Sequence, residues 1–309
     1  MRFINEHKQR NDGGLRWGVE SICAVLSEHG TPIAPSTCYE AAGRAPSKRA
    51  LRDGDLKVAI ARVRAANYDV YGPRKVWLAL NREGIPVARC TVERLMKDLQ
   101  LKGIRRGKQM VTTRPDPRAK RPADLVNRRF QPLAPNRLWV ADYTYVSTWS
   151  GMVYVAFVID AYARRILGWR ASTSMRTDLV LDTIEHAIWT RARDGVTDLS
   201  GLVHHNDAGS QYTSIAFTER LAAAGVDASV GNVGDALDNA LAESVIGLFK
   251  TELIRRRGPW RTVEHVEAAT LHWVDWFNRH RLLEVNGDLP PIELEQAYYR
   301  QTTSLDQAG

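Results

Sequence analysis

Apolar residues in the first hundred positions recur at helical spacing, in two similar copies. The shared positions lie 54 residues apart and are Ile22, Leu26, Gly30, Pro32 and Ala34 in one copy and Val76, Leu80, Gly84, Pro86 and Ala88 in the other. Each copy predicts a helix that ends at glycine, a short turn and a second helix, because glycine readily adopts the left-handed conformation that closes a helix. The second helices are predicted to begin near Ser36 and near Cys90 and Thr91, whose side chains are candidate caps.

The second helix of the second copy, predicted from about Thr91 to Leu99, has one apolar and one charged face. Its inward positions are Val92, Leu95, Met96 and Leu99, and its outward positions are Arg89, Glu93, Arg94 and Lys97. Two helices joined by a short turn with glycine match the layout of the DNA-binding helix-turn-helix, and a plain helical hairpin is the alternative. The nearby cations Arg74 and Lys75 favour DNA binding.

After residue 137 the apolar pattern changes from helical to strand-like. Strands are predicted at 138–146, 152–159, 166–170, 202–205 and 227–230, and helices at 177–192, 214–224 and 237–254. The β-branched and aromatic content of the first segments is typical of strands. Three strands followed by strands that alternate with helices predict an α/β fold, in which helices cover a mixed sheet.

Three acidic residues of this region stand where structure alone does not favour them. Asp142 falls in the middle of the first strand, where an unpaired buried carboxylate is costly. Asp207 follows a strand end, where α/β sheets present functional groups, although an ordinary turn explains it better when it is taken singly. Glu243 lies opposite the apolar stripe of its helix and shares a face with Lys250, which a solvated helix face explains equally well. Asp160, at the end of the second strand, is expected to be structural.

The charge along the chain favours a polyanionic partner. The 309 residues carry a net charge of +8, and the stretch from Arg105 to Arg129 holds nine basic residues against two acidic ones. This stretch has three prolines and no sustained apolar period. It therefore predicts an extended linker that tracks phosphates, and a charged connector without a ligand is the alternative.

Other function classes are disfavoured by what the sequence lacks. No apolar run approaches the roughly 20 residues that cross a bilayer. The charged N-terminus has no secretory apolar region, which predicts a cytoplasmic protein. Three scattered cysteines are too few for a disulfide framework or a zinc site.

Five motifs, in order along nearly the whole chain, resemble those of one family. They are Tyr71–Trp77 with Thr91–Met96, Trp139–Tyr145, His205–Tyr212, Asp238–Ser244 with Phe249 and Lys250, and Trp276–Asn278 with Arg281 and Pro291. Between Asp207 and Glu243 lie 35 residues, and Lys250 follows Glu243 by seven. On these motifs the chain resembles the DDE transposases and integrases, and more closely the OrfB proteins of bacterial insertion sequences of the "insertion sequence three" type. It departs from many relatives at Asn206 and Ala208, which flank Asp207.

The resemblance implies an RNase H-like catalytic core and the chemistry of DNA strand transfer. In this family two divalent ions, Mg²⁺ or Mn²⁺, are held by the three carboxylates, so Asp142, Asp207 and Glu243 are expected to be catalytic residues and metal ligands, with Asp142 bridging. The partner is expected to be double-stranded DNA, and the expected contacts are Lys250, Arg74, Lys75, Arg89, Arg94, Lys97, Arg105, Arg106 and Lys108. A homo-oligomer on DNA, association with the bacterial nucleoid and fusion to an upstream OrfA product by frameshifting are also implied.

Four segments follow from these observations. They are a helical DNA-binding region with two helix-turn-helix-like units (1–104), a basic proline-containing linker (105–137), the RNase H-like core (138–256) and a helical extension (257–309). The expected function is that of a transposase, which cleaves and transfers DNA strands at the ends of an insertion sequence. The alternatives are a DNA-binding regulator whose core no longer cuts, which would lack a metal ligand, and a nuclease that only hydrolyses.

Overall fold

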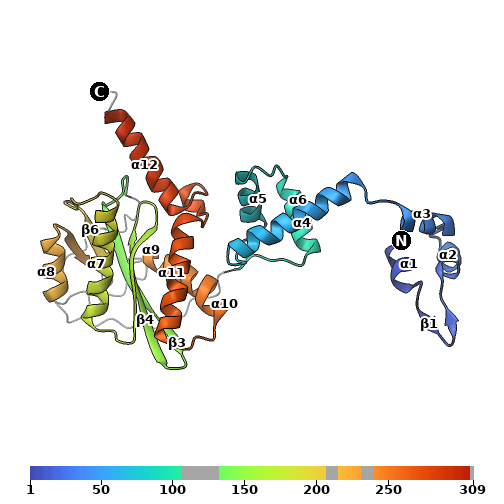
Figure 1. The fold of residues 1–309 in the computed structure, drawn as a ribbon, viewed down its shortest axis with the longest axis horizontal. Coiled ribbons are helices and arrows are strands. Elements are labelled where there is room, and N and C mark those ends of the chain that lie inside the picture. Colours follow the sequence, from blue (N-terminus) through green and yellow to red (C-terminus); the bar gives the residue numbers. More distant parts are fainter. Residues whose placement is uncertain (106–131, 207–214, 231–239, 307–309) are drawn as a thin grey trace. The chain divides into compact units, whose positions relative to one another are not determined.

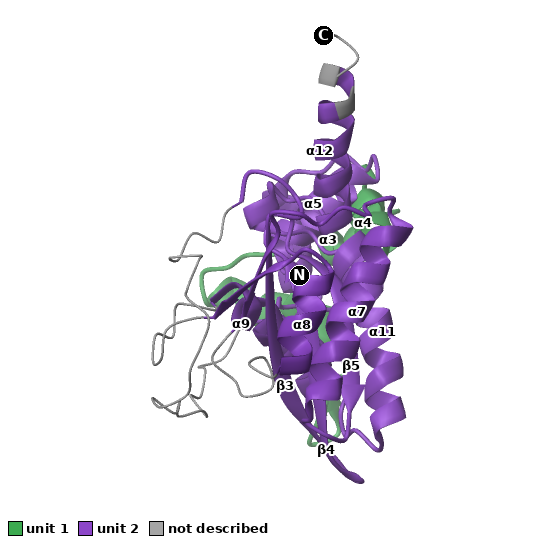
Figure 2. Cartoon of the chain, turned by 90° about the vertical axis from the view of Figure 1, so that its left-hand side faces the viewer, with its two compact units in different colours: residues 1–59 green, residues 60–309 purple. Residues whose placement is uncertain are grey.

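The computed structural model describes residues 1–105, 132–206, 215–230 and 240–306 (Figure 1). Its contacts divide the chain into two compact units, residues 1–59 and 60–309, with the boundary inside helix α4 (Lys48–Ala66) (Figure 2). Among the residues that the structure describes, no helix is long and apolar enough to span a membrane.

The first unit is small and mostly helical. Its elements are α1 (Arg2–His7), β1 (Asn11–Asp12), β2 (Leu15–Arg16), α2 (Val19–Glu28), α3 (Pro35–Gly43) and the first part of α4. Ile4, Ile22, Cys23 and Cys38 form its buried core. The free thiols of Cys23 and Cys38 lie 3.7 Å apart in this core.

The predicted glycine stops are confirmed in both copies of the repeat. After α2, Gly30 has a φ of +79°, and the Thr31 N–H donates to the Leu26 carbonyl at 2.8 Å. After α5 (Pro73–Arg82), Gly84 has a φ of +78°, and the Ile85 N–H donates to the Leu80 carbonyl at 3.0 Å. Both ends are Schellman motifs, which satisfy carbonyls that the helix leaves unpaired.

The predicted caps of the second helices are wrong. α3 begins at Pro35 and α6 (Arg89–Asp98) begins at Arg89, so both helices start before the hydroxyl and thiol residues. Their N-cap residues are Ala34 and Ala88, and no side chain caps either helix. Proline is favoured at the first helical position because its φ is already helical, and Pro35 starts α3 without a side-chain cap.

The predicted mixed sheet is confirmed in the second unit. Its strands are β3 (Leu138–Thr148), β4 (Gly151–Asp160), β5 (Arg165–Ser172), β6 (Val203–Asn206) and β7 (Asp227–Val230). They are ordered β5-β4-β3-β6-β7, with antiparallel pairing from β3 to β5 and parallel pairing from β3 through β6 to β7. The second unit therefore has an α/β architecture, as the resemblance implies, with β3 at the centre of its sheet.

Helices cover both faces of this sheet (Figure 1). α7 (Thr177–Arg193) and α8 (Ile215–Ala223) pack with Trp139, Ala141 and Leu167 on one face. On the other face, the Phe157 ring contacts Phe249 at the end of α9 (Ala240–Phe249) and Trp273 of α11 (Val263–Arg279). The other elements of this region are the π-helix η1 (Lys250–Ile254), α10 (Arg255–Arg257), the 3₁₀ helix η2 (Glu284–Asn286) and α12 (Pro291–Asp306).

A buried ionic cluster attaches α12 to the sheet. Asp160, at the end of β4, is fully buried and accepts from Arg191 of α7 at 2.8 Å. The same guanidinium donates to Glu295 of α12 at 2.5 Å. The N–H groups of Asn136 and Tyr162 also donate to the Asp160 carboxylate. The structural role expected for Asp160 is thus confirmed.

Candidate active site and DNA-binding face

Asp142 lies on β3 at the position where the neighbouring strand ends. The parallel pairing of β3 with β6 runs as far as Ala141 and Asn206, so Asp142 is the first residue of β3 beyond it. Its cross-strand partner on β4 is Phe157, and paired residues point to the same face of a sheet. Because Phe157 contacts α9, Asp142 is on the face that α9 covers. Its side chain is half-buried, and one carboxylate oxygen accepts from the Tyr143 N–H at 2.8 Å.

Glu243 is brought to this face by its helix. It stands in the first turn of α9, which packs against β3, and it is half-buried. The buried stripe of α9 is formed by Leu241, Ala242, Val245, Ile246 and Phe249, so the predicted apolar side of this helix is largely confirmed. Glu243 also lies near the positive end of the helix dipole, which favours a carboxylate there.

Asp207 falls outside the described residues, as do Arg106 and Lys108. Its chain neighbour Asn206 ends β6 and pairs with Ala141, beside Asp142. Within the described part of the chain, no three His, Cys, Asp or Glu side chains gather closely enough to hold a metal ion. The described residues therefore bring together elements that carry two of the three expected ligands.

Lys250 stands at the junction between α9 and the π-helix η1. Its ammonium lies 4.9 Å from the centre of the Tyr145 ring, and both side chains are accessible to solvent in part. Tyr145 belongs to β3 and lies three residues beyond Asp142. Among the described residues, the pairing of β6 with β3 ends at Ala141, and Lys250 contacts the ring beyond that point.

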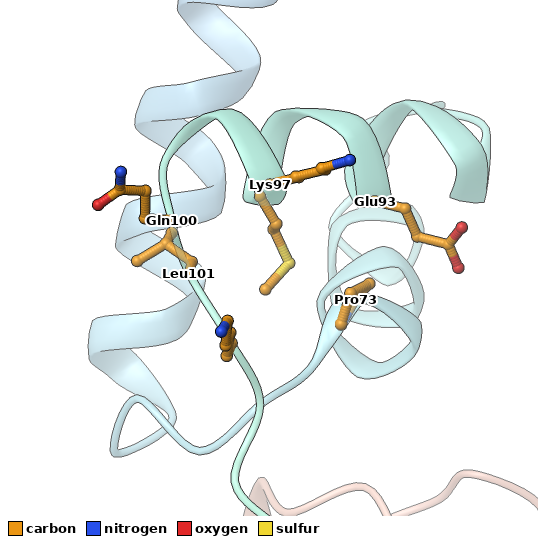
Figure 3. Close-up of a pocket in the computed structure, with 7 residues that line it drawn as sticks. Pro73, Glu93, Lys97, Gln100 and Leu101 are labelled. Atoms are coloured by element: carbon orange, nitrogen blue, oxygen red, sulfur yellow. The ribbon is translucent and has the colours of Figure 1, made fainter.

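The outer face of α6 has the predicted charged composition. Val92, Leu95 and Met96 are buried, as predicted, and Arg89 and Lys97 are exposed. Arg89 pairs with Glu93 at 2.8 Å and Arg94 with Asp98 at 3.7 Å. Lys97, Lys102 and Arg105 are further exposed cations of this region. An open cavity of about 670 Å³ lies beside α6 (Figure 3). It is lined by Pro73, Glu93, Met96, Lys97, Gln100, Leu101 and Lys102.

Arg74 and Lys75, two of the expected DNA contacts, face the protein. Arg74 donates to both carboxylate oxygens of Asp288, at 2.8 and 2.6 Å. Lys75 is packed 5.3 Å from the centre of the Tyr71 ring. Burial, helped by the nearby charge of Arg281, lowers the pKa of Lys75 to about 8. The pairing of Arg74 with Asp288 spans 214 residues, so no spacing in the sequence could have shown it.

Sequence reasoning also missed a buried ion pair behind these residues. Glu252 of η1 and Arg281 are 95% or more inaccessible, and the guanidinium donates to the two carboxylate oxygens at 2.9 and 2.5 Å. Arg281 stands in one of the five sequence motifs, and Glu252 belongs to none of them. The helix predicted over 237–254 gave no indication that its last turn widens at Lys250, which is the turn that carries Glu252.

Comparison with known protein families agrees with this architecture. Residues 132–236 and 224–291 match two models described as integrase core domain, and residues 50–109 match a model described as HTH-like domain. The first two matches cover the sheet and the helices α9 and α11, and the third covers α5 and α6.

The chain is also similar to individual proteins of mobile elements. A Mycobacterium tuberculosis protein named for insertion sequence element IS986/IS6110 is 66% identical over 270 residues, which cover 87% of this chain and 97% of the relative. The transposase for insertion sequence element IS629 of Shigella sonnei is 50% identical and covers 95% of this chain and 97% of its own length.

Two solved structures show weaker likeness. The simian T-cell lymphotropic virus intasome is 14% identical, with a TM-score of 0.44 over 76% of this chain and 74% of the other. The HTLV-2 integrase catalytic core is 15% identical, with a TM-score of 0.40 over 53% of this chain and 98% of the other. On its sequence relatives and its domain matches, the chain belongs to the insertion-sequence transposases, enzymes of the DDE transposase and integrase superfamily.

Proposed function

We propose that the chain cuts DNA at the ends of the insertion sequence that encodes it and joins those ends to target DNA. One observation carries the proposal: Asp142 is on the sheet face covered by α9, and Glu243 stands in the first turn of α9. An HTH-like domain in the same chain as an integrase core supports DNA as the substrate. Residues 138–256 supply the chemistry, 1–104 and 105–137 contact DNA, and 257–309 brace the core.

Asp142, Asp207 and Glu243 are the proposed ligands of two divalent cations, Mg²⁺ or Mn²⁺. The donor chemistry fits, because hard cations prefer carboxylate oxygens. The burial also fits, since Asp142 and Glu243 are both half-buried and so remain open to an entering ion and substrate. When bound, such ions favour deprotonation of the attacking hydroxyl and stabilise the charge on the leaving oxygen. Asp142, Asp207 and Glu243 would together hold the two ions.

Lys250 is the proposed phosphate contact next to the carboxylates. It follows Glu243 by seven residues, which is about 10.5 Å along a helix, too far for a ligand of the same ions. Its ammonium rests on the Tyr145 ring at 4.9 Å, a weak contact that a phosphate can compete with. The exposed cations Arg89, Lys97 and Arg105 and the half-buried Arg94 are proposed to contact the duplex elsewhere, together with Arg106 and Lys108.

The test compares Glu243→Gln with Glu264→Gln. Glu264 also lies in the first turn of a helix, α11, but it is exposed and lies outside the proposed site, so it controls for the loss of a helix-end carboxylate. Each protein is incubated with Mg²⁺ and a duplex that carries the terminal sequence of its own element, and joined product is scored on a gel. We expect Glu243→Gln to abolish joining and weaken Mn²⁺ binding measured by calorimetry, and Glu264→Gln to do neither. Joining by Glu243→Gln at the wild-type rate would overturn the assignment.

Lys250 is tested in the same assay at two DNA concentrations. Lys250→Ala should bind Mn²⁺ normally and lose most joining when DNA is limiting, and Lys250→Arg should keep part of the activity because the charge remains. Joining by Lys250→Ala at the normal rate with limiting DNA would show that this lysine is only a solvated side chain.

The assembly is proposed to be a homo-oligomer on DNA, with the product of the upstream OrfA frame fused to it in the active form. Two DNA ends must be held together for joined insertion, which one chain with one set of carboxylates does not provide. Light scattering with and without terminal DNA measures the number of chains, and a single chain per DNA end with full joining activity would contradict this proposal.

A further inference from the structure

The segment around Tyr71 is docked on the C-terminal part of the same compact unit. Tyr71 is 1% exposed, and its hydroxyl accepts from the Leu282 N–H at 2.8 Å and donates to the His280 carbonyl at 3.3 Å. The Trp276 indole N–H donates to the side chain of Asn67 at 3.1 Å. The short turn before α5 is therefore tied by hydrogen bonds to the end of α11 and the residues that follow it.

Ion pairs extend this contact along α5. Arg74 in its first turn makes the two-pronged pair with Asp288, and Arg82 at its end pairs with Glu293 at 2.5 Å. A bidentate guanidinium–carboxylate pair fixes direction as well as distance, because two parallel hydrogen bonds allow little rotation. We call the set of Tyr71, Arg74, Arg82 and their partners the docking joint.

Buried charged side chains and their hydrogen bonds fix the interior of the docking joint. Beneath Tyr71 and Lys75 lies the buried pair of Glu252 and Arg281, which neighbours the end of α9. Arg64, also buried, donates to the carbonyls of Tyr71 and Asp69 at 3.1 and 2.7 Å and so fixes the turn from inside. The joint thus connects α5 to the same helical segment that carries the proposed catalytic Glu243.

We propose that Tyr71 and Arg74 are positioning residues that set where the transposase cuts. By holding α5 and α6 against the segment after α9, they fix the separation between the DNA sequence bound by α6 and the phosphodiester at the carboxylates. The inference rests on the proposed function, because it assumes that α6 binds the terminal DNA. It differs from the expectation that Arg74 contacts phosphate, since the guanidinium is held by Asp288 instead.

The charge distribution separates the two interpretations. A cation is more available to a phosphate when its carboxylate partner is itself exposed. The Asp288 side chain, which holds Arg74, is only 22% exposed, whereas the Glu93 side chain, which pairs with Arg89, is 45% exposed. Misplacement of a bound group by about 1 Å can lower a reaction rate about 100-fold. Release of the docking joint should therefore reduce correct joining strongly and leave the affinity for DNA almost unchanged.

The test uses three variants of the full chain: Arg74→Asp, Asp288→Arg, and the double variant that carries both substitutions. Arg89→Ala is the control for a lost DNA contact. Affinity for the terminal duplex, the amount of joined product and the nucleotide positions of the cuts are measured. We expect each single exchange to bind DNA within about twofold of wild type, to lose joining tenfold or more and to cut at several positions. The double exchange should restore one cut position, and Arg89→Ala should weaken binding.

Two results would overturn the proposal. One is that Arg74→Asp loses DNA affinity as Arg89→Ala does while Asp288→Arg cuts normally, which would make Arg74 a phosphate contact. The other is that the double exchange behaves no better than the single ones. Hydrogen exchange of the Leu282 amide is measured without DNA, and docking requires faster exchange in the single variants and recovery in the double variant. The exchange measurement tests whether the docking joint holds α5 in place, and it does not depend on joining activity. If the wild-type chain makes no joined product, that result would refute the proposed function and not the docking joint.

Discussion

Acid should destabilise the core through one buried histidine of β6. His204 is fully buried in register with Trp139 and Ala228, and its ring packs 5.4 Å from Phe217. Among the described residues, neither ring nitrogen has a hydrogen-bond partner. Burial, with the nearby His205 as a smaller cause, lowers the pKa of His204 to about 3. The folded protein therefore keeps this ring neutral under conditions in which the unfolded chain protonates it.

The sign and size of the effect follow from the two pKa values. Between about pH 6.5 and 3 the unfolded chain binds the proton that the folded protein refuses, so stability falls as the pH falls. At about 1.4 kcal/mol for each pKa unit, the full loss is about 5 kcal/mol at pH 3, and about 2 kcal/mol of it is already present at pH 5. Above pH 7 this contribution no longer changes.

The assay is urea unfolding at pH 7.5 and pH 5.0, followed by tryptophan fluorescence. His204→Leu removes the titrating ring and keeps an apolar side chain of similar volume, so its free energy of unfolding should fall by about 2 kcal/mol less than that of wild type between the two pH values. His272→Leu, on the exposed side of α11, is the matched control and should follow wild type. An equal loss in wild type and His204→Leu would refute the reasoning.

Three further predictions concern stability. Gly168→Ala should lower the free energy of unfolding by about 1–3 kcal/mol or more, because the added Cβ would lie 2.2 Å from the Thr183 carbonyl oxygen. An unchanged melting temperature would contradict the close approach of α7 to β5. Arg281→Met should lower the free energy of unfolding by about 3–5 kcal/mol, because it leaves the buried Glu252 carboxylate without its partner. In urea unfolding, the double variant with Glu252→Met should regain most of this stability. A double variant as unstable as the single one would argue against the ion pair. The free energy of unfolding of the wild-type protein should rise by about 2 kcal/mol between pH 7.5 and 9.5, because the folded protein, in which the pKa of Lys75 is lowered to about 8, releases a proton that the unfolded chain still holds. Lys75→Met should abolish this rise in urea unfolding. An equal rise in both proteins would show that Lys75 is not buried as described.

Local patterns predicted most of the elements of the fold. The strands at 138–146 and 152–159 differ from β3 and β4 by at most two residues at each end, because alternation and β-branched content leave few other arrangements. Both helix stops at glycine are confirmed for the same kind of reason. The caps were wrong because Pro35 and Arg89 extend their helices by one or two residues, and helix starts have several competing signals.

The functional residues could be predicted only where chemistry conflicts with local structure. Asp142 was conspicuous because a carboxylate in a buried strand has no structural explanation, and the structure places it beside the end of β6. Arg74 gave the opposite result: its charge suggested DNA, yet its partner Asp288 lies 214 residues away. No periodicity connects positions that distant. The assignment of Asp207 stays a prediction, because the described residues end at its neighbour.

The two helix-turn-helix copies differ at the positions that make the docking joint, and this has an evolutionary consequence. At the 54-residue offset, Trp17 stands in place of Tyr71 and Glu20 in place of Arg74. An indole can donate but cannot accept the hydrogen bond that Tyr71 accepts, and a glutamate would repel Asp288. The first copy therefore lacks these two residues of the docking joint, and under the proposed DNA contact of residues 1–104 its substitutions should alter DNA preference without moving the cut. When an element of this kind adapts to altered ends or to a new host genome, substitutions should accumulate first on α3, while the second copy changes only together with the surface that holds it.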